Sequence, residues 1–356
     1  MGFPMKLAHY RSLVTAAVLL LIGFPALVSW TQGGETTAPI TLIGAGATFP
    51  APLYKKWMAV YQESHPNVAI TYQAVGSGEG IKRFLAETVD FAGSDEFLST
   101  EDAAKVEKGA VTVPAAAGMV VLAYNIPGVT GEIRLPRDVF TDIFAGSISR
   151  WNDPRIEAAN PGVHFPARNI ALIARLDSSG TTAAFTRHLA AADSTWRARG
   201  RGIGKLISWP AATMLAAGNE GVASRIKISE GSIGYVEYGF AKRLGLHMAA
   251  LQNKAGASIA PSETAAQLAL SARVARVNEL ERSIIDPPAA GAYPIVSYSW
   301  LFLYRQFPDR AKAETIRDFV GWGLTEGQHY GAELGYIPLS ADVVSVGREE
   351  LNAVAY

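Results

Sequence analysis

The stretch from Ala171 to Phe185, ALIARLDSSGTTAAF, constrains the fold of this chain more than any other. Its opening residues, Ala171 to Ile173, are short and apolar, as in a buried strand. A Ser/Gly/Thr run then leads into a helical pattern that begins with Ala183. A loop of this kind leaves backbone N–H groups unpaired at the helix start, where the helix dipole favours an anion. The stretch therefore predicts a strand–loop–helix corner with an anion site at its helix N-terminus.

The polar side chains of this stretch suit an oxyanion. Ser179 and Thr181 can donate through hydroxyl groups, and Arg175 offers a planar fork of N–H donors. Asp177 is close enough in sequence to pair with Arg175 and hold its orientation. The alternative for this stretch alone is an ordinary Ser/Thr-capped helix beside a surface arginine.

Two further corners of the same kind occur earlier in the chain. Thr41 to Ile43 has a strand pattern, and GAGATF after it places Thr48 at the start of a helix. GAGATF begins like a dinucleotide-binding fingerprint, but Phe49 stands where the third glycine belongs, so we reject that interpretation. Val68 to Val75 alternates like a strand, and the glycines around Ser77 in the following GSGEG let the backbone approach a ligand closely. A flexible turn is the alternative for GSGEG. Repeated units of this kind predict an α/β fold.

An aspartate at the end of the next strand sets a condition on the anion. VDFAGSD predicts a short strand ending at Asp95, and Ser99 to Asp102 has the pattern of a helix cap. A carboxylate can only accept hydrogen bonds, so Asp95 suits an anion that still carries a proton. Hydrogen phosphate has such a proton, and sulfate at neutral pH has none.

Composition restricts the class of protein. The length of 356 residues suits about two domains after a targeting segment is removed. A net charge of zero argues against a polyanion-binding surface, so we expect no nucleic-acid partner. The chain has no cysteine, which excludes disulfides and thiolate metal sites. Its six histidines lack the spacing of a zinc site, so we expect no metal and no cofactor.

The N-terminus has the pattern of an export signal. Lys6 and Arg11 supply positive charge before the apolar run from Leu13 to Trp30. We assign residues 1–38 to a signal peptide and linker, with cleavage expected between Ala26 and Thr37. An uncleaved N-terminal anchor is the alternative, because the apolar run is near the lower limit for a membrane span.

Several long motifs then identify a family. GAGATFPAPLYKKW, YQAVGSGEGIK, VDFAGSD, RLDSSGTTAAFT and GSIGYVEY follow one another in this order. Together they resemble the phosphate-binding protein of Pst-type phosphate ABC importers, a periplasmic solute receptor, over essentially the whole chain from Ile40 onward. The resemblance implies a two-lobed periplasmic-binding-protein fold of type II that holds phosphate between its lobes. It also implies a monomer whose partners are inorganic phosphate and the membrane permease subunits of the importer.

The resemblance further implies the residues that bind phosphate. By motif position they are Thr48, Phe49 (through its backbone N–H), Ser77, Asp95, Arg175, Asp177, Ser179, Gly180 and Thr181.

The chain departs from the family pattern at three places. Glu79 adds a carboxylate beside Ser77, and we expect it to point outward. Glu96 and Phe97 stand where the family commonly has a small residue and proline, which puts the shape of that loop in doubt. Ser178 replaces a frequent glycine, a mild change at a turn.

Two apolar strands are expected to cross between the lobes and form a hinge. Met119 to Asn125 is the first crossing, and Pro294 to Tyr304 is the second. We expect residues 39–123 and 296–356 to form lobe I and residues 124–295 to form lobe II. Ligand binding should then close the lobes by a rigid-body motion.

Within lobe II, the pattern makes three smaller predictions. Thr264 to Val277 predicts one helix. Tyr235 and Tyr238 of GSIGYVEY are expected in the core rather than in contact with ligand. The segment around Asn219 leads into a further helix start that can face the cleft.

A catalytic function is the weakest alternative. His188 follows Ser179 on the same predicted helix, so a Ser–His–Asp phosphatase can be drawn from this stretch. A side chain further along a helix points away from its N-terminus, however, and the G-x-S-x-G pattern is absent. We therefore expect no enzyme, and a receptor for another oxyanion (sulfate, molybdate or arsenate) remains the nearer alternative.

Overall fold

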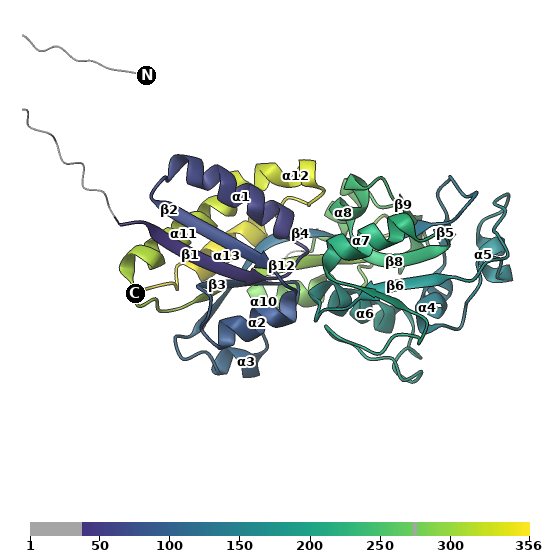
Figure 1. The fold of residues 1–356 in the computed structure, drawn as a ribbon, viewed down its shortest axis with the longest axis horizontal. Coiled ribbons are helices and arrows are strands. Elements are labelled where there is room, and N and C mark those ends of the chain that lie inside the picture. The colour runs from purple at the N-terminus through teal and green to yellow at the C-terminus, as the bar shows by residue number, and fades with distance from the viewer. Residues whose placement is uncertain (1–37, 273–275) are drawn as a thin grey trace, which may run out of the picture. The chain divides into compact units, whose positions relative to one another are not determined.

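The computed structural model describes residues 38–272 and 276–356, and the predicted signal peptide and its cleavage region lie outside them. In the described chain, a nine-stranded sheet has the order β2-β1-β3-β12-β4-β8-β6-β7, with β9 paired to β4 (Figure 1). A smaller sheet has the order β11-β10-β5. The strands are β1 (Ile40–Gly46), β2 (Val68–Ala74), β3 (Phe91–Ser94), β4 (Ala110–Asn125), β5 (Arg134–Leu135), β6 (Ala171–Arg175), β7 (Met214–Ala216), β8 (Ser232–Glu237), β9 (His247–Met248), β10 (Ala250–Gln252), β11 (Ser258–Ile259) and β12 (Val296–Tyr304).

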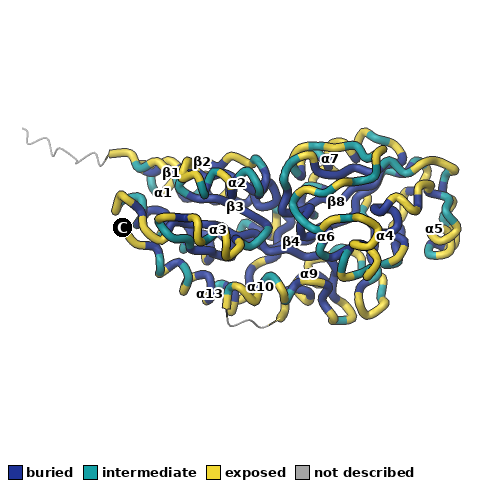
Figure 2. The backbone as a smooth tube through the Cα atoms, turned by 90° about the horizontal axis from the view of Figure 1, so that it is seen from below, coloured by how far each residue is buried: buried dark blue, intermediate teal, exposed yellow. Residues whose placement is uncertain are grey.

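Helices alternate with these strands, which confirms the predicted α/β class. They are α1 (Ala51–Ser64), α2 (Ser77–Leu85), α3 (Thr100–Ala104), α4 (Arg137–Ala145), α5 (Pro154–Ala159), α6 (Gly180–Ala192), α7 (Gly218–Ile228), α8 (Tyr238–Arg243), α9 (Glu263–Ala269), α10 (Val277–Ser283), α11 (Arg310–Gly323), the 3-10 helix η1 (Glu326–Tyr330), α12 (Gly331–Leu334) and α13 (Ala341–Leu351). Figure 2 shows the buried residues along the central strands and the exposed residues on the outer helices and loops.

The long strand β4 belongs to both halves of the main sheet. Its residues up to Met119 pair with β12, and its residues from Val120 onward pair with β8. We call the half with β1, β2, β3 and β12 the first lobe, and the half with β6, β7 and β8 the second lobe. The predicted strand from Met119 to Asn125 is therefore only the second part of a 16-residue strand. Its inner residues are buried and, apart from Thr112, apolar, as expected of a strand covered on both faces.

Helix α1 shows how the sequence builds the first lobe. Leu53, Trp57 and Tyr61 recur at helical spacing and are all buried. The indole N–H of Trp57 donates to the carbonyl oxygen of Gly327 at 2.6 Å, which ties α1 to η1. Prolines at the helix entrance lack an N–H that would have no partner there in any case.

The glycines of GAGATF serve strand packing. Gly46 has a φ of +144°, and a Cβ at this position would lie 2.0 Å from the carbonyl oxygen of Gly93. A Cβ on Gly44 would collide with the ring of Phe91. The two glycines thus let β1 lie against β3, so this loop starts α1 close to the end of the neighbouring strand.

One predicted helix is wrong. The pattern from Thr264 to Val277 predicts a single helix, but α9 ends at Ala269 and α10 begins at Val277. Ser262 caps α9 by accepting a hydrogen bond from the N–H of Ala265. Within residues 38–272 and 276–356, no helix combines the length and the apolar character that a membrane crossing requires.

Candidate anion-binding site

Three strand–loop–helix corners meet where the first lobe faces the second. Ser77 begins α2, Asp95 follows β3, and Gly180 begins α6. The hydroxyl oxygen of Ser77 accepts hydrogen bonds from the N–H of Asp95 at 3.2 Å and from the N–H of Gly180 at 3.1 Å. A Cβ on Gly180 would lie 2.4 Å from this oxygen, so the approach of the two lobes requires glycine here. The buried hydrogen bond from Gly180 thus joins the two lobes.

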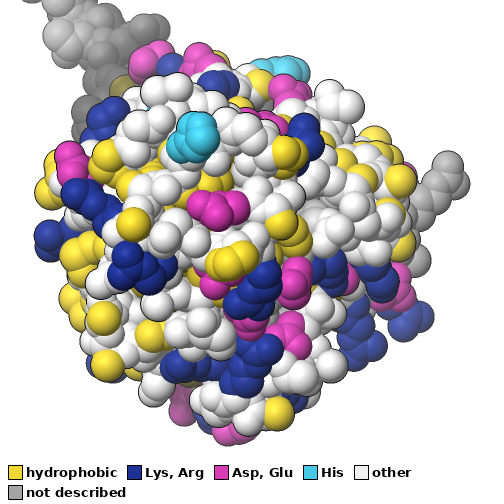
Figure 3. Space-filling model, turned by 90° about the vertical axis from the view of Figure 1, so that its right-hand side faces the viewer, with side chains coloured by type: hydrophobic (Ala, Val, Ile, Leu, Met, Phe, Trp, Pro, Cys, Tyr) yellow, Lys and Arg dark blue, Asp and Glu magenta, His cyan; other side chains and the backbone are white. Residues whose placement is uncertain are grey.

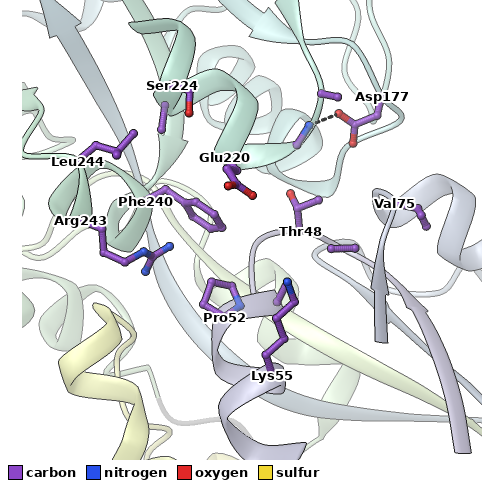
Figure 4. A pocket seen from close by; sticks show the side chains of 15 residues that line it. Thr48, Pro52, Lys55, Val75, Asp177, Glu220, Ser224, Phe240, Arg243 and Leu244 are labelled. Atoms are coloured by element: carbon purple, nitrogen blue, oxygen red, sulfur yellow. Dashed lines mark hydrogen bonds between the residues drawn. The ribbon is translucent and has the colours of Figure 1, made fainter. Parts of the chain in front are cut away.

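Arg175, the last residue of β6, is buried and held by the neighbouring acidic side chain. Its Nε donates to Oδ1 of Asp177 at 2.8 Å, and a second hydrogen bond joins its Nη2 to Oδ2. Asp177 Oδ1 also accepts from the N–H of Gly218 at 2.9 Å, the bond drawn in Figure 4. Burial raises the pKa of Asp177, but the hydrogen bond and charge of Arg175 outweigh burial and leave the pKa below its ordinary value. The pair is therefore ionised, and its geometry leaves Nη1 of Arg175 directed at Thr181, 3.3 Å from its hydroxyl oxygen.

Asp95 is the buried acceptor opposite these donors. Its Oδ1 accepts from the hydroxyl of Ser299 at 2.8 Å, and its Oδ2 accepts from the hydroxyl of Thr181 at 3.3 Å. Burial raises the pKa of Asp95 to about 7, while the Ser299 hydrogen bond and the charge of Arg175 act in the opposite direction. Near neutral pH the carboxyl group is therefore partly protonated, and its ionised form can accept a hydrogen bond from a ligand that carries a proton.

Asn219 connects the two lobes beside this acceptor. It is the second residue of α7 and is fully buried. Its backbone N–H and its Nδ2 both donate to the hydroxyl oxygen of Thr48, at 3.1 and 3.0 Å. Its Nδ2 also lies 3.2 Å from the hydroxyl oxygen of Thr181. We call the whole set the buried seam: Thr48, Ser77, Asp95, Arg175, Thr181 and Asn219.

The hydroxyls of the buried seam share one polarity. Those of Thr48, Ser77 and Thr181 each accept two hydrogen bonds from N–H donors. A hydroxyl oxygen has two acceptor positions and one O–H. Each of the three can therefore only donate through its O–H. That of Thr181 donates to Asp95, the single carboxyl acceptor of the seam, and those of Thr48 and Ser77 remain to donate. Such a set suits a tetrahedral oxyanion that carries one proton.

Two other predicted residues have local roles. The hydroxyl of Ser179 caps α6 by accepting from the N–H of Thr182 at 3.1 Å. The ring of Phe49 points into the core, where it lies 6.2 Å from the ring of Tyr336 between centroids. Only the backbone of Phe49 adjoins the seam, next to Thr48, and the prediction for this residue concerns its N–H.

The departures from the family pattern have clear outcomes. Glu79 faces outward, as expected, and pairs with Arg83 at 2.9 Å. Glu96 forms an ion pair with Lys205 and lies 3.6 Å from a guanidinium nitrogen of Arg187. We call Glu96, Lys205 and Arg187 the ionic rim, because these half-buried side chains join the two lobes at the edge of the buried seam. The carbonyl oxygen of Ser178 accepts from the N–H of Gly78 at 2.9 Å, another bond between the lobes.

Sequence reasoning missed three polar residues of this region. Asn219 follows a glycine at a helix start, as Ser77 does, and the sequence pattern predicted only that its segment leads into a helix start that can face the cleft. Ser299 lies in an apolar strand where the register with β4 shifts, and nothing local distinguishes it. Tyr235 lies in the core as predicted, but its hydroxyl also accepts from the N–H of Arg175 at 3.1 Å and bonds to Thr182 at 2.6 Å.

A pocket of about 510 Å³ adjoins the seam, with α1 on one side and α7 and α8 on the other (Figure 4). It is lined by Thr48, Lys55, Asp177, Glu220 and Arg243 among others. On the face shown in Figure 3, basic and acidic side chains are interspersed, as expected for a chain of zero net charge. Among the described residues there is no group of His, Asp and Glu that could hold a metal ion.

Comparison with known proteins identifies the family that the sequence motifs resemble. A family model for the PBP superfamily domain matches residues 32–326. The phosphate-binding protein PstS of Xylella fastidiosa is 37% identical over 312 residues, which are 87% of this chain and 84% of the relative. The phosphate-binding protein PstS of Methanocaldococcus jannaschii is 34% identical over 92% of this chain and 89% of the relative.

Solved structures show the same fold. The phosphate-binding protein from Stenotrophomonas maltophilia has a TM-score of 0.71 at 21% identity and covers 90% of this chain and 96% of its own. A high-affinity periplasmic phosphate-binding protein bound with phosphate has a TM-score of 0.70 at 20% identity, with 89% and 99% covered. These likenesses confirm the predicted two-lobed periplasmic-binding-protein fold.

Proposed function

Because this chain belongs to the PstS-type phosphate-binding proteins of the PBP superfamily, we propose that it captures inorganic phosphate between its lobes and delivers it to an ABC importer. The observation that carries the proposal is the polarity of the buried seam. Three hydroxyls with filled acceptor positions and one guanidinium share a buried cluster with a single carboxyl group, to which Thr181 donates.

Phosphate is bound by hydrogen bonds alone in this proposal. The donors are hydroxyls, backbone N–H groups at helix starts and the Arg175 guanidinium. The proposed phosphate-binding residues are Thr48, Phe49, Ser77, Asp95, Arg175, Asp177, Ser179, Gly180 and Thr181. Each hydrogen bond to a charged group contributes about 1.5–3 kcal/mol before desolvation is subtracted. A buried anion requires a partner for every oxygen, because an uncompensated buried charge costs about 3–5 kcal/mol.

Asp95 gives the site its preference among anions. An ionised carboxylate accepts a hydrogen bond from the O–H of hydrogen phosphate, whereas against sulfate it would meet an oxygen with no proton between them. Two acceptors held together in a dry site repel, so sulfate is excluded by the same contact that favours phosphate. A seam of this polarity supports a receptor for protonated tetrahedral anions.

We propose a division at 39–123 with 296–356 for lobe I and 124–295 for lobe II. The change of partner along β4 after Met119 supports a first crossing close to this boundary, and the start of β12 at Val296 supports the second. Closure about these crossings buries the anion.

The remaining assignments follow from the family. We propose that residues 1–38 export the chain to the periplasm, where it acts as a monomer without a cofactor or a metal. The permease subunits of the importer receive the phosphate, and the protein catalyses no reaction. Hydrolysis of a chromogenic phosphate ester that disappears in Ser179→Ala would contradict this.

Isothermal titration with phosphate and then with sulfate tests the proposed function. We expect one phosphate per chain and an affinity for sulfate at least about 100-fold weaker at pH 8. Comparable affinities would contradict the role of Asp95, and binding of molybdate in preference to phosphate would identify a different oxyanion receptor.

A further inference from the structure

Asn219 is held rigidly at the point where the lobes meet. Gly218 before it has a φ of +66°, and its N–H is bound by Asp177, so the start of α7 is fixed on both sides. The side-chain oxygen of Asn219 accepts from the N–H of Glu237 in β8 at 2.9 Å. This bond sets the orientation of the amide, because the flipped form would place its NH2 group against the N–H of Glu237.

Both amide hydrogens of Asn219 then have a defined target. The Nδ2 atom lies 3.0 Å from the hydroxyl oxygen of Thr48 and 3.2 Å from that of Thr181. Thr48 belongs to the first lobe and Thr181 to the second. One amide group therefore supplies an N–H to a hydroxyl from each lobe.

This arrangement decides what the two hydroxyls can do. A threonine hydroxyl ordinarily rotates and can either donate or accept. At Thr48 the backbone N–H and the amide of Asn219 fill both acceptor positions, and at Thr181 Arg175 and Asn219 do the same. Each O–H can therefore only donate: that of Thr181 donates to Oδ2 of Asp95 at 3.3 Å, and that of Thr48 is left to donate. We propose that Asn219 is a positioning residue that fixes the hydroxyls of Thr48 and Thr181 as donors at the anion site, an inference that rests on the proposed phosphate site.

The test is a mutant cycle on phosphate binding by the exported protein. Asn219→Ala lowers phosphate affinity by about 10- to 100-fold, the range expected for a hydrogen bond to a charged group. The same substitution in a Thr48→Val/Thr181→Val background has an effect of about threefold or less, because the hydroxyls through which Asn219 acts are gone. An equal loss in both backgrounds identifies Asn219 as a merely structural residue and overturns the inference.

Asn219→Asp provides a second variant in case Asn219→Ala fails to fold, because aspartate keeps the shape of the side chain. A carboxylate accepts where the amide donates, so the hydroxyls turn toward it and the anion is repelled. We expect a loss larger than that of Asn219→Ala. Affinity equal to that of the wild type overturns the inference.

Asn253 is the matched control. It is also a fully buried asparagine of the second lobe, and its amide bonds only to backbone groups, including the carbonyl oxygen of Ala290 at 2.8 Å. Asn253→Ala lowers the melting temperature and leaves phosphate affinity within about twofold of the wild type. Wild-type protein that binds no phosphate overturns the proposed function and this inference together, whereas tight binding by both wild type and Asn219→Ala overturns this inference alone.

Discussion

The buried seam and the ionic rim both join the two lobes, but they do so by different physics. In the seam, the side chains of Ser77, Thr181 and Asn219 have no exposed surface. In the rim, the side chains of Glu96 and Lys205 are 23% and 31% exposed. The rim has formal ion pairs between the lobes, whereas the contacts between lobes in the seam are hydrogen bonds of hydroxyl, amide and backbone groups with one carboxyl.

The difference shows that formal charge alone does not determine how much free energy a contact contributes. A half-exposed ion pair gains at most about 1 kcal/mol, because water and salt screen it. A buried polar group left without a partner costs about 1–3 kcal/mol. We therefore expect ligand affinity and selectivity to depend on the seam, and the rim to adjust only the stability of the closed arrangement.

The largest difference between the two regions is expected for their arginines. Arg175→Met should lower phosphate affinity by about 100-fold or more, since it removes a buried charged donor and leaves Asp177 without its charged partner. Arg187→Met in the rim should lower it by no more than about threefold. Titration calorimetry measures both, and equal losses would show that the distinction is wrong.

The pH dependence of stability comes next in size. Burial raises the pKa of Asp95 to about 7 and that of Glu237 to about 8 in the folded chain, so the folded state keeps protons that the unfolded chain has already released. The free energy of unfolding of phosphate-free protein should therefore fall between pH 6.5 and pH 8, by on the order of 2 kcal/mol. This window lies above the range in which His188, whose pKa burial lowers to about 4, acts in the opposite direction.

Urea unfolding at several pH values measures this slope. The variant Asp95→Asn/Glu237→Gln should flatten it, and Glu96→Gln in the rim should leave it unchanged. A slope that persists in the double variant would assign it to other groups.

Asp95 of the seam and Glu96 of the rim are neighbours in sequence, but only Asp95 is expected to affect anion selectivity. Asp95→Asn should reduce the ratio of phosphate affinity to sulfate affinity by about tenfold at pH 8, because an amide can donate to a sulfate oxygen. Glu96→Gln, one residue further along, should leave the ratio unchanged. If both variants alter the ratio alike, selectivity arises from the overall field rather than from the buried acceptor.

The smallest effect is expected at the rim itself. Glu96→Gln should speed phosphate dissociation by up to about threefold at low ionic strength, and the difference should vanish near 0.5 M salt. Stopped-flow measurement at two salt concentrations gives the answer. The loss in Asn219→Ala should persist at both concentrations, and a rim effect that is independent of salt would contradict the ionic explanation.

The strand–loop–helix corners could be predicted from the sequence, because each corner is encoded by consecutive residues. Ser77 and Gly180 each begin a helix that follows a strand, and Asp95 directly follows a strand; a corner of this kind shows in a few consecutive residues. The α/β class follows from the same repetition.

Contacts between distant segments could not be predicted in this way. Ser299 reaches Asp95 across 204 positions of sequence, and Asn219 reaches Thr48 across 171. Glu96 stood out only as an unusual residue after Asp95, since its partner Lys205 is 109 positions away. The register of the strands and the packing of one lobe against the other determine these pairs. Neither leaves a pattern in consecutive residues of the sequence.

Gly180 sets a size limit on the approach of the lobes. It has no positive φ, so alanine fits its helix start, yet the added methyl group would meet Ser77 and Asp95 on the opposite side. Gly180→Ala should therefore act as a spacer one carbon atom thick, with each lobe intact and full closure prevented. An importer tested with the Gly180→Ala receptor would then show whether it responds to bound phosphate or to the closeness of the two lobes. In the native chain these two signals always occur together.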